Sequence, residues 1–226
     1  IELTAIIQTA LCVGAGGSSG SLADKAIART ATGQLLIPAS QVKGRVRHEC
    51  EKIARGLGWP VCDSPKADTM CPQRAGFPEE EEEKFHREDY RVEADAETDR
   101  HHCLICQIFG NTVLRSRVIF DDLICQEEPE NLPEVLRPGV TINRDLRVAE
   151  DQKLFLLETS PPNLNLRFTG EMIFRSNCPK YAELLILAAL RHINAFGGSK
   201  SSGLGWLKWE LPSVSSDRFG DLKATS

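Results

Sequence analysis

Two segments with helical periodicity, far apart in the chain, restrict its fold more than any other feature. Apolar residues recur three or four positions apart in both: Val42, Val46, Cys50, Ile53 and Leu57 in the first, and Leu185, Ile186, Ala189, Leu190 and Ile193 in the second. Glycines follow each segment, as they do at helix ends. The pattern predicts one helix from Ala39 to about Gly56 and another from Tyr181 to Phe196, each with one buried face.

Extended segments flank both helices. They are Glu2–Val13, Arg115–Phe120 and Leu204–Leu211, together with a β-ribbon from Val140 to Phe174 that is broken at Pro161-Pro162-Asn163. The order of elements is therefore strand, helix, strand, ribbon, helix, strand. This order predicts an α+β fold with a ferredoxin-like (RRM-like) split βαβ core, a core that RNA-recognition modules also use.

The chain, residues 1–226, is predicted to form a single domain with two insertions. Residues 59–106 lack a clear period and contain four cysteines and an acidic run. We interpret them as a first insertion, partly disordered around Glu79–Glu83. The second insertion, residues 125–174, contains the β-ribbon and would form a thumb. A chain of 226 residues is long enough for one core with such additions.

Charge is unevenly distributed along the chain. The formal net charge is −5, but the run Glu79–Asp99 holds 11 acidic and 3 basic residues, so the remainder carries +3. Because local charge governs contacts with phosphate, the negative total does not exclude nucleic-acid binding. No run of about 18 apolar residues exists and no signal peptide is visible, so no membrane partner is expected. The eight cysteines occur in a chain with long periodic segments rather than in a short, loop-rich disulfide scaffold, so a cytoplasmic protein is expected.

Two donor-rich motifs are candidate anion sites. Ile37–Arg47 begins a predicted helix, whose free N–H groups attract anions, and Gly197–Trp206 is a glycine-rich loop that a phosphate can approach closely. The candidate RNA-binding residues are Ser40, Gln41, Lys43 and Arg47 in the first motif, and Gly198, Ser199, Lys200, Ser201 and Ser202 in the second. The alternatives are a capped surface helix with solvated cations and a flexible connection between helix and strand.

Four of the eight cysteines lie in the first insertion. Cys103 and Cys106 form a C-x-x-C pair, and Cys62 and Cys71 precede it. Four thiolates can close a tetrahedral zinc site, which would hold together a segment with little apolar content. Three histidines can each replace one cysteine: His48, His101 and His102. Free thiols or a redox-active pair are the alternatives, although no thioredoxin-like context surrounds the C-x-x-C.

Five blocks resemble conserved elements of the RAMP superfamily and follow one another in the family order. They are Thr32–Gly44 (similar to TG-x-x-x-IPGSSLKG), Cys106–Gly110 (C-x-L-F-G), Arg117–Asp122 (R-x-x-F-x-D), Val140–Glu158 (I-D-R…LF-x-x-E) and Gly197–Gly205, the glycine-rich loop. Their joint occurrence is far more specific than any single block. Three positions depart from the family pattern: Ala39, Gln41 and Asn143. Within the superfamily, the blocks resemble the repeated backbone subunit of type III CRISPR effector complexes.

The resemblance implies a protein of antiviral defence that assembles with copies of itself and other effector subunits along a guide crRNA. The first-helix block and the glycine-rich loop would contact the guide backbone. The ribbon, from Val140 to about Phe168 and including Arg144, would act as a thumb that displaces base pairs between guide and target RNA. Base pairing rather than the protein would supply sequence specificity.

The resemblance also implies that the loop before the first-helix block carries an aspartate needed for target cleavage, and Asp24 is the only aspartate there. Asp24 follows a glycine/serine stretch, so it is expected to be mobile and exposed. Its carboxylate can hold Mg²⁺ or another divalent cation, or orient a ribose 2′-hydroxyl for in-line attack. The alternative is an ordinary turn aspartate.

These features leave four hypotheses about function. The leading one is a guide-binding backbone subunit that is also a metal-dependent endoribonuclease, and the second keeps RNA binding but drops cleavage. The third is a guide-processing nuclease with a histidine base, although His48 and His192 both lie in predicted helices. The fourth is a zinc-stabilised protein-interaction module, which predicts no salt-dependent binding of RNA.

Overall fold

The computed structural model describes residues 1–14, 23–86, 90–92 and 100–211. Its largest sheet has six strands: β1 (Glu2–Ile7), β2 (Leu36–Ile37), β5 (Val118–Phe120), β6 (Leu123–Cys125), β9 (Leu166–Phe174) and β10 (Leu207–Glu210). The strand order is β10-β1-β9-β6-β2, with β5 also paired to β9, and all pairings are antiparallel. The predicted α+β class is therefore confirmed, with antiparallel sheets.

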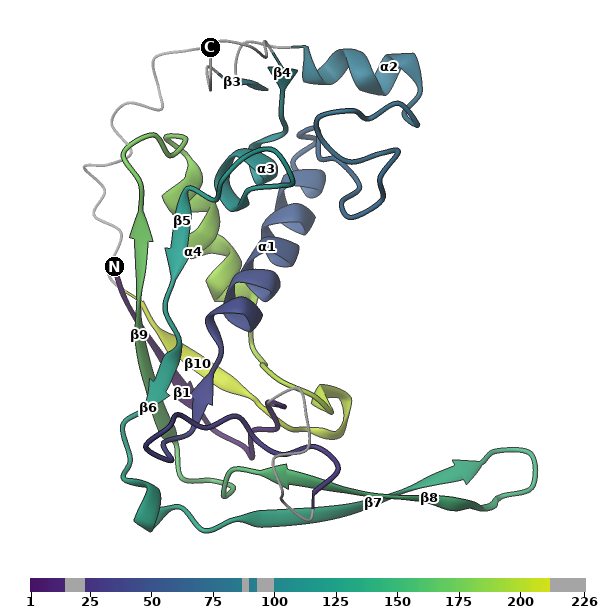
Figure 1. Ribbon diagram of the computed structural model, residues 1–226, viewed down its shortest axis with the longest axis vertical. Coiled ribbons are helices and arrows are strands. Elements are labelled where there is room, and N and C mark those ends of the chain that lie inside the picture. Colours follow the sequence, from purple (N-terminus) through teal and green to yellow (C-terminus); the bar gives the residue numbers. More distant parts are fainter. Residues whose placement is uncertain (15–22, 87–89, 93–99, 212–226) are drawn as a thin grey trace.

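Two long helices, α1 (Ala39–Gly56) and α4 (Ala182–His192), pack against each other on one face of this sheet (Figure 1). In the chain, α1 lies between β1 and the pair β5 and β6, whereas α4 lies between β9 and β10. Because β1 and β9 are neighbours, the two strand–helix–strand halves interlock in the middle of the sheet.

The hydrophobic core lies between the sheet and these helices. Strand residues such as Leu3, Phe168 and Met172 and helix residues such as Val46 and Ile186 are fully buried in one cluster. Burial of each such side chain contributes on the order of 2 kcal/mol of transfer free energy. The apolar positions that predicted the two helices are thus the positions that pack into the core, except Leu57, which follows α1 and is exposed.

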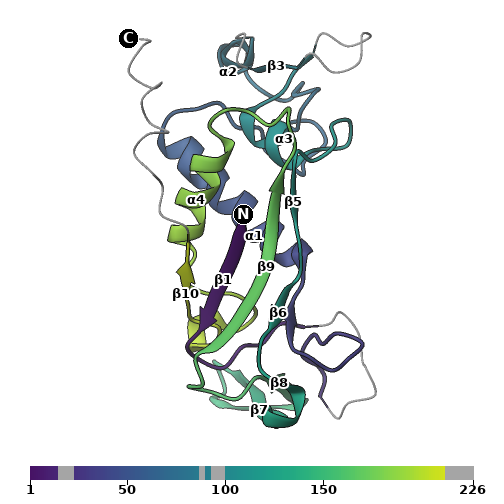
Figure 2. The same cartoon turned by 90° about the vertical axis from the view of Figure 1, so that its left-hand side faces the viewer.

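The first insertion forms one end of the molecule (Figures 1 and 2). Its elements are α2 (Glu79–Glu82), the 3₁₀ turn η1 (Glu83–Phe85), the short strand pair β3 (Arg91–Val92) and β4 (Arg100–His101), and α3 (Leu104–Phe109). The prediction of disorder around Glu79–Glu83 was wrong, because Glu82 pairs with Arg74 and Phe85 is buried beneath. The rest of the acidic run falls partly outside the described residues.

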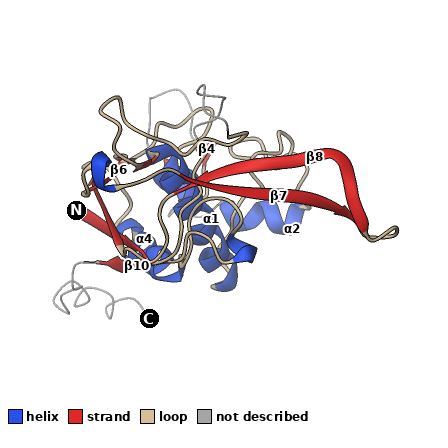
Figure 3. Ribbon diagram, turned by 90° about the horizontal axis from the view of Figure 1, so that it is seen from below, coloured by secondary structure: helices blue, strands red, loops and turns tan. Residues whose placement is uncertain are grey.

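The ribbon forms the opposite end and extends away from the body (Figures 1 and 3). It consists of β7 (Val135–Asn143) and β8 (Val148–Thr159) and follows the 3₁₀ turn η3 (Pro129–Asn131). The sequence had suggested a break at Pro161–Asn163 between the two extended runs of the ribbon. Instead, the ribbon turns between β7 and β8, and the run after the prolines is β9, which pairs with β1 in the central sheet. An alternating pattern alone does not show whether this run pairs within the ribbon or with β1.

Two other elements are shorter than predicted. Helix α4 ends at His192 rather than Phe196, and the last strand begins at Leu207 rather than Leu204. The reason is local, since the N–H of Phe196 and the carbonyl oxygen of Gly205 pair across the glycine-rich loop at 2.9 Å. None of the helices in the described part of the chain is long and apolar enough to span a membrane.

Candidate nucleic-acid interface and metal centre

A side chain from the sheet caps the N-terminus of α1. Asp122, between β5 and β6, accepts a 2.6 Å hydrogen bond at Oδ1 from the N–H of Ala39. The N–H groups of Gln41 and Val42 are also bonded, to a carbonyl oxygen in the same turn. The expected set of free N–H groups is therefore mostly occupied, because a carboxylate lies at the positive end of the helix and, of the first four N–H groups, only that of Ser40 makes no hydrogen bond within the described residues.

Lys43 and Arg47 have different surroundings although they are one helical turn apart. Arg47 points into the fold, where its Nε pairs with Glu51 at 3.0 Å. Its Nη1 donates to the carbonyl oxygen of Gly110 at 3.0 Å, and its Nη2 lies 3.9 Å from Cys106 Sγ. Lys43 has no hydrogen-bond or ionic partner in the described part of the chain. Of the two predicted RNA contacts, Lys43 is thus the one whose charge is available to a ligand.

The glycine-rich loop between α4 and β10 presents backbone donors to solvent. It contains the 3₁₀ turn η4 (Lys200–Ser202), which is entered and left through left-handed residues, Ser199 at φ 53° and Gly203 at φ 85°. Three exposed backbone N–H groups make no hydrogen bond within the described residues: those of Ser199, Lys200 and Ser201. The side chains of Lys200 and Ser202 instead donate to carbonyl oxygens of the loop itself, each at 2.9 Å. Consecutive backbone N–H groups without an internal partner suit a phosphate oxygen.

The same loop is fixed to the segment that follows β1. The N–H of Gly198 donates to the carbonyl oxygen of Cys12 at 2.7 Å, and that of Gly205 donates to Ala10 at 2.8 Å. Gly205 has a φ of +72°, and a Cβ there would lie 1.8 Å from the carbonyl oxygen of Phe196, so only glycine fits. This irregular packing ends β1 at Ile7, which explains why the predicted first strand was too long. Figure 1 places the loop and the first turn of α1 in the half of the molecule nearest the ribbon.

Arg144 lies apart from these two motifs. It is exposed in the turn between β7 and β8, which Figure 3 shows at the far end of the ribbon. Asn143 shapes this turn, since its Oδ1 accepts hydrogen bonds from the N–H groups of Asp145 and Leu146, both at 3.0 Å. An aspartate, the usual family residue, would make the same turn, so this departure preserves the geometry.

Asp24 is attached to the base of the ribbon. Its N–H donates to the carbonyl oxygen of Leu156 in β8 at 3.0 Å, and its Oδ2 accepts a 2.7 Å hydrogen bond from the N–H of the same residue. The side chain is exposed, as predicted, but the residue is held in place by the strand. Oδ1 has no partner within the described residues. The glycine/serine stretch before it lies mostly outside the described part of the chain, at residues 15–22.

Glu158 secures this attachment from the buried side of β8. The residue is 3 % exposed, and both of its carboxylate oxygens are used: Oε2 accepts from the N–H of Ile27 at 3.1 Å and Oε1 pairs with Arg29 at 3.0 Å. Its own N–H donates to the carbonyl oxygen of Lys25 at 3.1 Å. The segment that carries Asp24 is therefore held by β8 of the ribbon, so its position follows the ribbon rather than the glycine-rich loop.

The four cysteines of the first insertion meet in one buried group. Their Sγ atoms all lie within 4.8 Å of one another, with Cys62 at 3.5 Å from Cys106 and at 3.7 Å from Cys103. A tetrahedral site with zinc–sulfur bonds of ~2.3 Å separates its sulfurs by about 3.8 Å, whereas a disulfide requires about 2.05 Å. The group, completed by Cys71, can thus hold a metal ion such as zinc. No histidine in the described residues joins it.

Protons are unequally shared among these thiols. Hydrogen bonds, first from Cys103 and then from Cys106, lower the pKa of Cys62 to about 7 and lower that of Cys71 further. The hydrogen bond with Cys106 raises the pKa of Cys103. Without a cation, the cluster must therefore keep protons between crowded sulfurs. A divalent cation bound to the four sulfurs would replace these protons, so the sulfurs would no longer compete for them.

Two arginines lie close to different sulfurs of the group. Arg74, only 3 % exposed, donates from Nη1 to Cys71 Sγ at 3.1 Å. It also forms a two-point pair with Glu82, at 2.8 and 2.9 Å, and its guanidinium carbon lies 4.3 Å from the ring centroid of Phe85. Arg47 of α1 reaches Cys106, as described above. Because four thiolates outweigh the charge of one divalent cation, both arginines stabilise a metal-bound cluster.

Sequence patterns did not reveal several of these residues. Arg74 carried no signal, because its partner Glu82 belongs to a charge run that was interpreted as solvated. Asp122 and Glu158 did carry a sequence signal, since both belong to blocks that resemble the superfamily. Both were recognised only as parts of those blocks, and the structure supplies their contacts.

The arrangement described so far agrees with a comparison with protein families. The model of the RAMP superfamily matches residues 4–208, so the chain belongs to that superfamily. Membership indicates a CRISPR-associated RNA-binding subunit. A search of curated proteins found no match.

Proposed function

We propose that the protein is a guide crRNA-binding backbone subunit of a type III CRISPR effector complex in the cytoplasm, built on a ferredoxin-like core. The strand order β10-β1-β9-β6, with a helix in each half, supports this core. The partners are the guide, the paired target RNA, further copies of the chain and other effector subunits. The first insertion, residues 59–106, is a zinc-binding module, and the second, residues 125–174, supplies the thumb.

The proposal of RNA binding rests chiefly on one observation: three consecutive exposed residues of the glycine-rich loop have N–H groups without a hydrogen bond in the described residues, and the loop contains no carboxylate. They can receive a phosphate without any rearrangement of side chains. Lys43 supplies a charge, and Arg144 at the ribbon turn is placed for a separate contact. The purified native complex should contain RNA of defined length, and binding should weaken steeply with salt. A complex free of nucleic acid would overturn this function.

We also propose that Asp24 is the residue needed for target cleavage. Its free Oδ1 is the atom that can orient a ribose 2′-hydroxyl or serve as one ligand of Mg²⁺. A single carboxylate is a sparse protein site, so the cation would take its other ligands from RNA phosphates and water. The backbone pairing with Leu156 keeps this oxygen at the base of the thumb, where a displaced base would expose the adjacent phosphate.

The test is an assembled complex with Asp24→Ala. Cleavage opposite this subunit should fall at least ~100-fold, while target binding stays within about twofold. Asp68→Ala, which removes an exposed aspartate in the first insertion, is the matched control and should cut normally. Undiminished cutting by the Asp24 variant removes Asp24 from the reaction.

One observation favours the second candidate, a scaffold that binds RNA without cutting it. Oδ2 of Asp24 already accepts a hydrogen bond from the N–H of Leu156, as a structural turn residue would. Under this alternative no cleavage product maps opposite the subunit with any divalent ion, whichever residue stands at position 24.

A further inference from the structure

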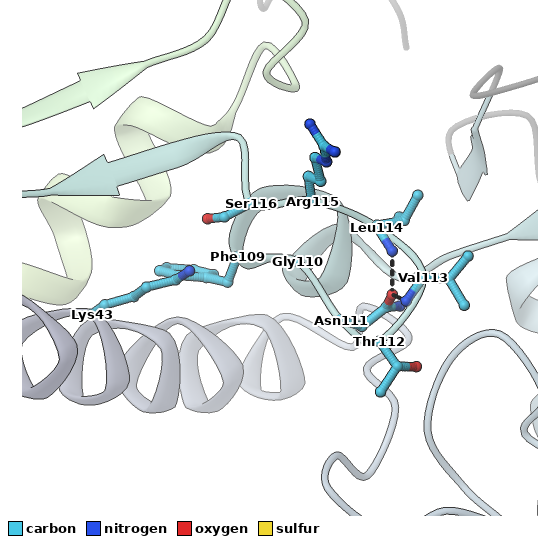
Figure 4. A pocket seen from close by; sticks show the side chains of 9 residues that line it. All are labelled: Lys43, Phe109, Gly110, Asn111, Thr112, Val113, Leu114, Arg115 and Ser116. Atoms are coloured by element: carbon cyan, nitrogen blue, oxygen red, sulfur yellow. Dashed lines mark hydrogen bonds between the residues drawn. The ribbon is translucent and has the colours of Figure 1, made fainter.

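A groove runs between α1 and the loop that follows α3. It has a volume of about 550 Å³, is open to solvent, and is lined by Lys43 and residues 109–116. Figure 4 shows the side chain of Lys43 extending along Phe109 toward this loop, from which Arg115 projects. The lining contains two cations, Lys43 and Arg115, and no acidic residue. A ligand in the groove would therefore meet positive charge only.

The loop that walls the groove is firmly built. Gly110 has a φ of +81°, and a Cβ there would lie 2.7 Å from the N–H nitrogen of Ser116. Asn111 accepts at Oδ1 from the N–H groups of Val113 and Leu114, at 2.9 and 2.7 Å. Arg47 holds the carbonyl oxygen of Gly110 from behind. The groove is thus a preformed feature with fixed walls.

Both cations of the groove are available, in contrast to the other cations of α1. Three of those pair with glutamates of the same helix: Arg45 with Glu49, Arg47 with Glu51, and Lys52 with Glu49. A fourth, Arg55, pairs with Asp63. Neither Lys43 nor Arg115 has an ionic or hydrogen-bond partner in the described part of the chain. Burial, and then the charge of Arg47, lowers the pKa of Lys43, and an anion beside it would relieve this cost.

We propose that this groove binds the backbone of a single-stranded RNA, with Lys43 contacting one phosphate beside α1 and Arg115 contacting another farther along the loop. The inference rests on the proposed RNA-binding function and extends it from the first turn of α1 to the loop at residues 110–116. An open groove with two separated cations and the hydroxyl-bearing Thr112 suits a strand that passes through it, whereas a free phosphate ion favours an enclosed site.

The experiment measures binding of the full chain to a fluorescein-labelled single-stranded RNA of mixed sequence, by anisotropy, over a series of salt concentrations. Arg115→Ala and Lys43→Ala should each weaken binding about 5-fold or more near 0.1 M salt. Each should also lower the slope of log K against log salt by about 0.7, the value for one phosphate contact on a single strand. Arg115→Lys should restore most of the loss.

Arg191→Ala, which removes an exposed arginine from α4, is the matched control and should bind like the unmodified chain. Thermal melts of all variants show whether the fold is intact. If both groove variants bind like Arg191→Ala, the groove proposal is wrong while RNA binding elsewhere stands. If the unmodified chain binds no RNA at all, the proposed function itself fails. Competition by inorganic phosphate beyond its effect on ionic strength would indicate a free-phosphate site and overturn the proposal.

Discussion

The two ends of the molecule hold their insertions to the core in different ways. At the base of the ribbon, one buried carboxylate, that of Glu158, satisfies the N–H of Ile27 and the guanidinium of Arg29. At the other end, four crowded thiols meet, and only added positive charge resolves their competition. The comparison indicates that the ribbon end is held by contacts between side chains and backbone, whereas the cysteine end can hold a metal ion. It also implies that the two ends will respond differently to the same kind of damage.

The largest effect should come from removal of the metal ligands. Cys103→Ser, or a strong chelator, should abolish stoichiometric zinc binding. The first insertion then loses the binding free energy of a structural zinc site, roughly 10–16 kcal/mol. Hydrogen exchange should then lose protection across residues 59–106 while β1 and β9 stay protected. Cys178→Ser, at a half-buried cysteine outside the cluster, is the control. Unchanged protection without metal would contradict the difference between the ends.

The next largest effect should come from Glu158→Ala at the ribbon end. The change leaves Arg29 and a buried N–H without their partner and should cost about 3 kcal/mol in urea unfolding. Zinc content should not change. The control is Glu171→Ala at an exposed glutamate of β9, which should alter stability by less than about 0.5 kcal/mol. A similar loss in both variants would show that the buried pair has no special role.

Arg74→Met tests whether the arginine beside Cys71 supports metal binding by the four cysteines. The methionine keeps much of the apolar stem but loses the donors to Cys71 and Glu82, so zinc affinity should fall about 10-fold in a competition titration with a chromophoric chelator. Arg167→Met, which breaks an exposed pair with Glu210 in the central sheet, is matched in chemistry and should leave the affinity unchanged. Equal affinities in the two variants would remove Arg74 from the support of the metal centre.

The smallest effect concerns the core helix between the two ends. Asp122→Ala removes the side chain that caps α1 and should cost about 1 kcal/mol, whereas Asp122→Asn should keep most of that stability. Neither change should affect zinc content or the ribbon. Asp121→Ala, at the exposed neighbouring aspartate, is the control for urea unfolding, and a loss equal to that of Asp122→Ala would rule out the capping role.

The sequence predicted regular elements well where a period was long and poorly where the partner was distant. Helix α1 was placed correctly because its apolar positions recur over four turns. The strand after Pro161-Pro162 was assigned to the ribbon, because an alternating pattern specifies a face but not a neighbour. The acidic helix α2 was missed because one buried arginine, Arg74, lies outside the run that it stabilises.

In the candidate site, too, one part could be predicted from local sequence patterns and another could not. The four cysteines were predicted as a group from their C-x-x-C pair and their shared insertion, and they lie together. The anion site at the start of α1 was predicted from the helix alone. Asp122, from the connection between β5 and β6, places its carboxylate there, and the block that contains Asp122 does not by itself reveal this contact.

The sequence by itself determined which residues form the core helices, which cysteines share an insertion, and the superfamily to which the blocks belong. Each of these depends on spacing within the chain. Only the tertiary structure decided that Lys43 faces a groove while Arg47 contacts the cysteine group, and that Asp24 is held by the ribbon. The physical reason is that Arg47 and Asp24 are directed by groups that satisfy their hydrogen bonds and come from elsewhere in the sequence, whereas Lys43 is left without such a partner in the described residues.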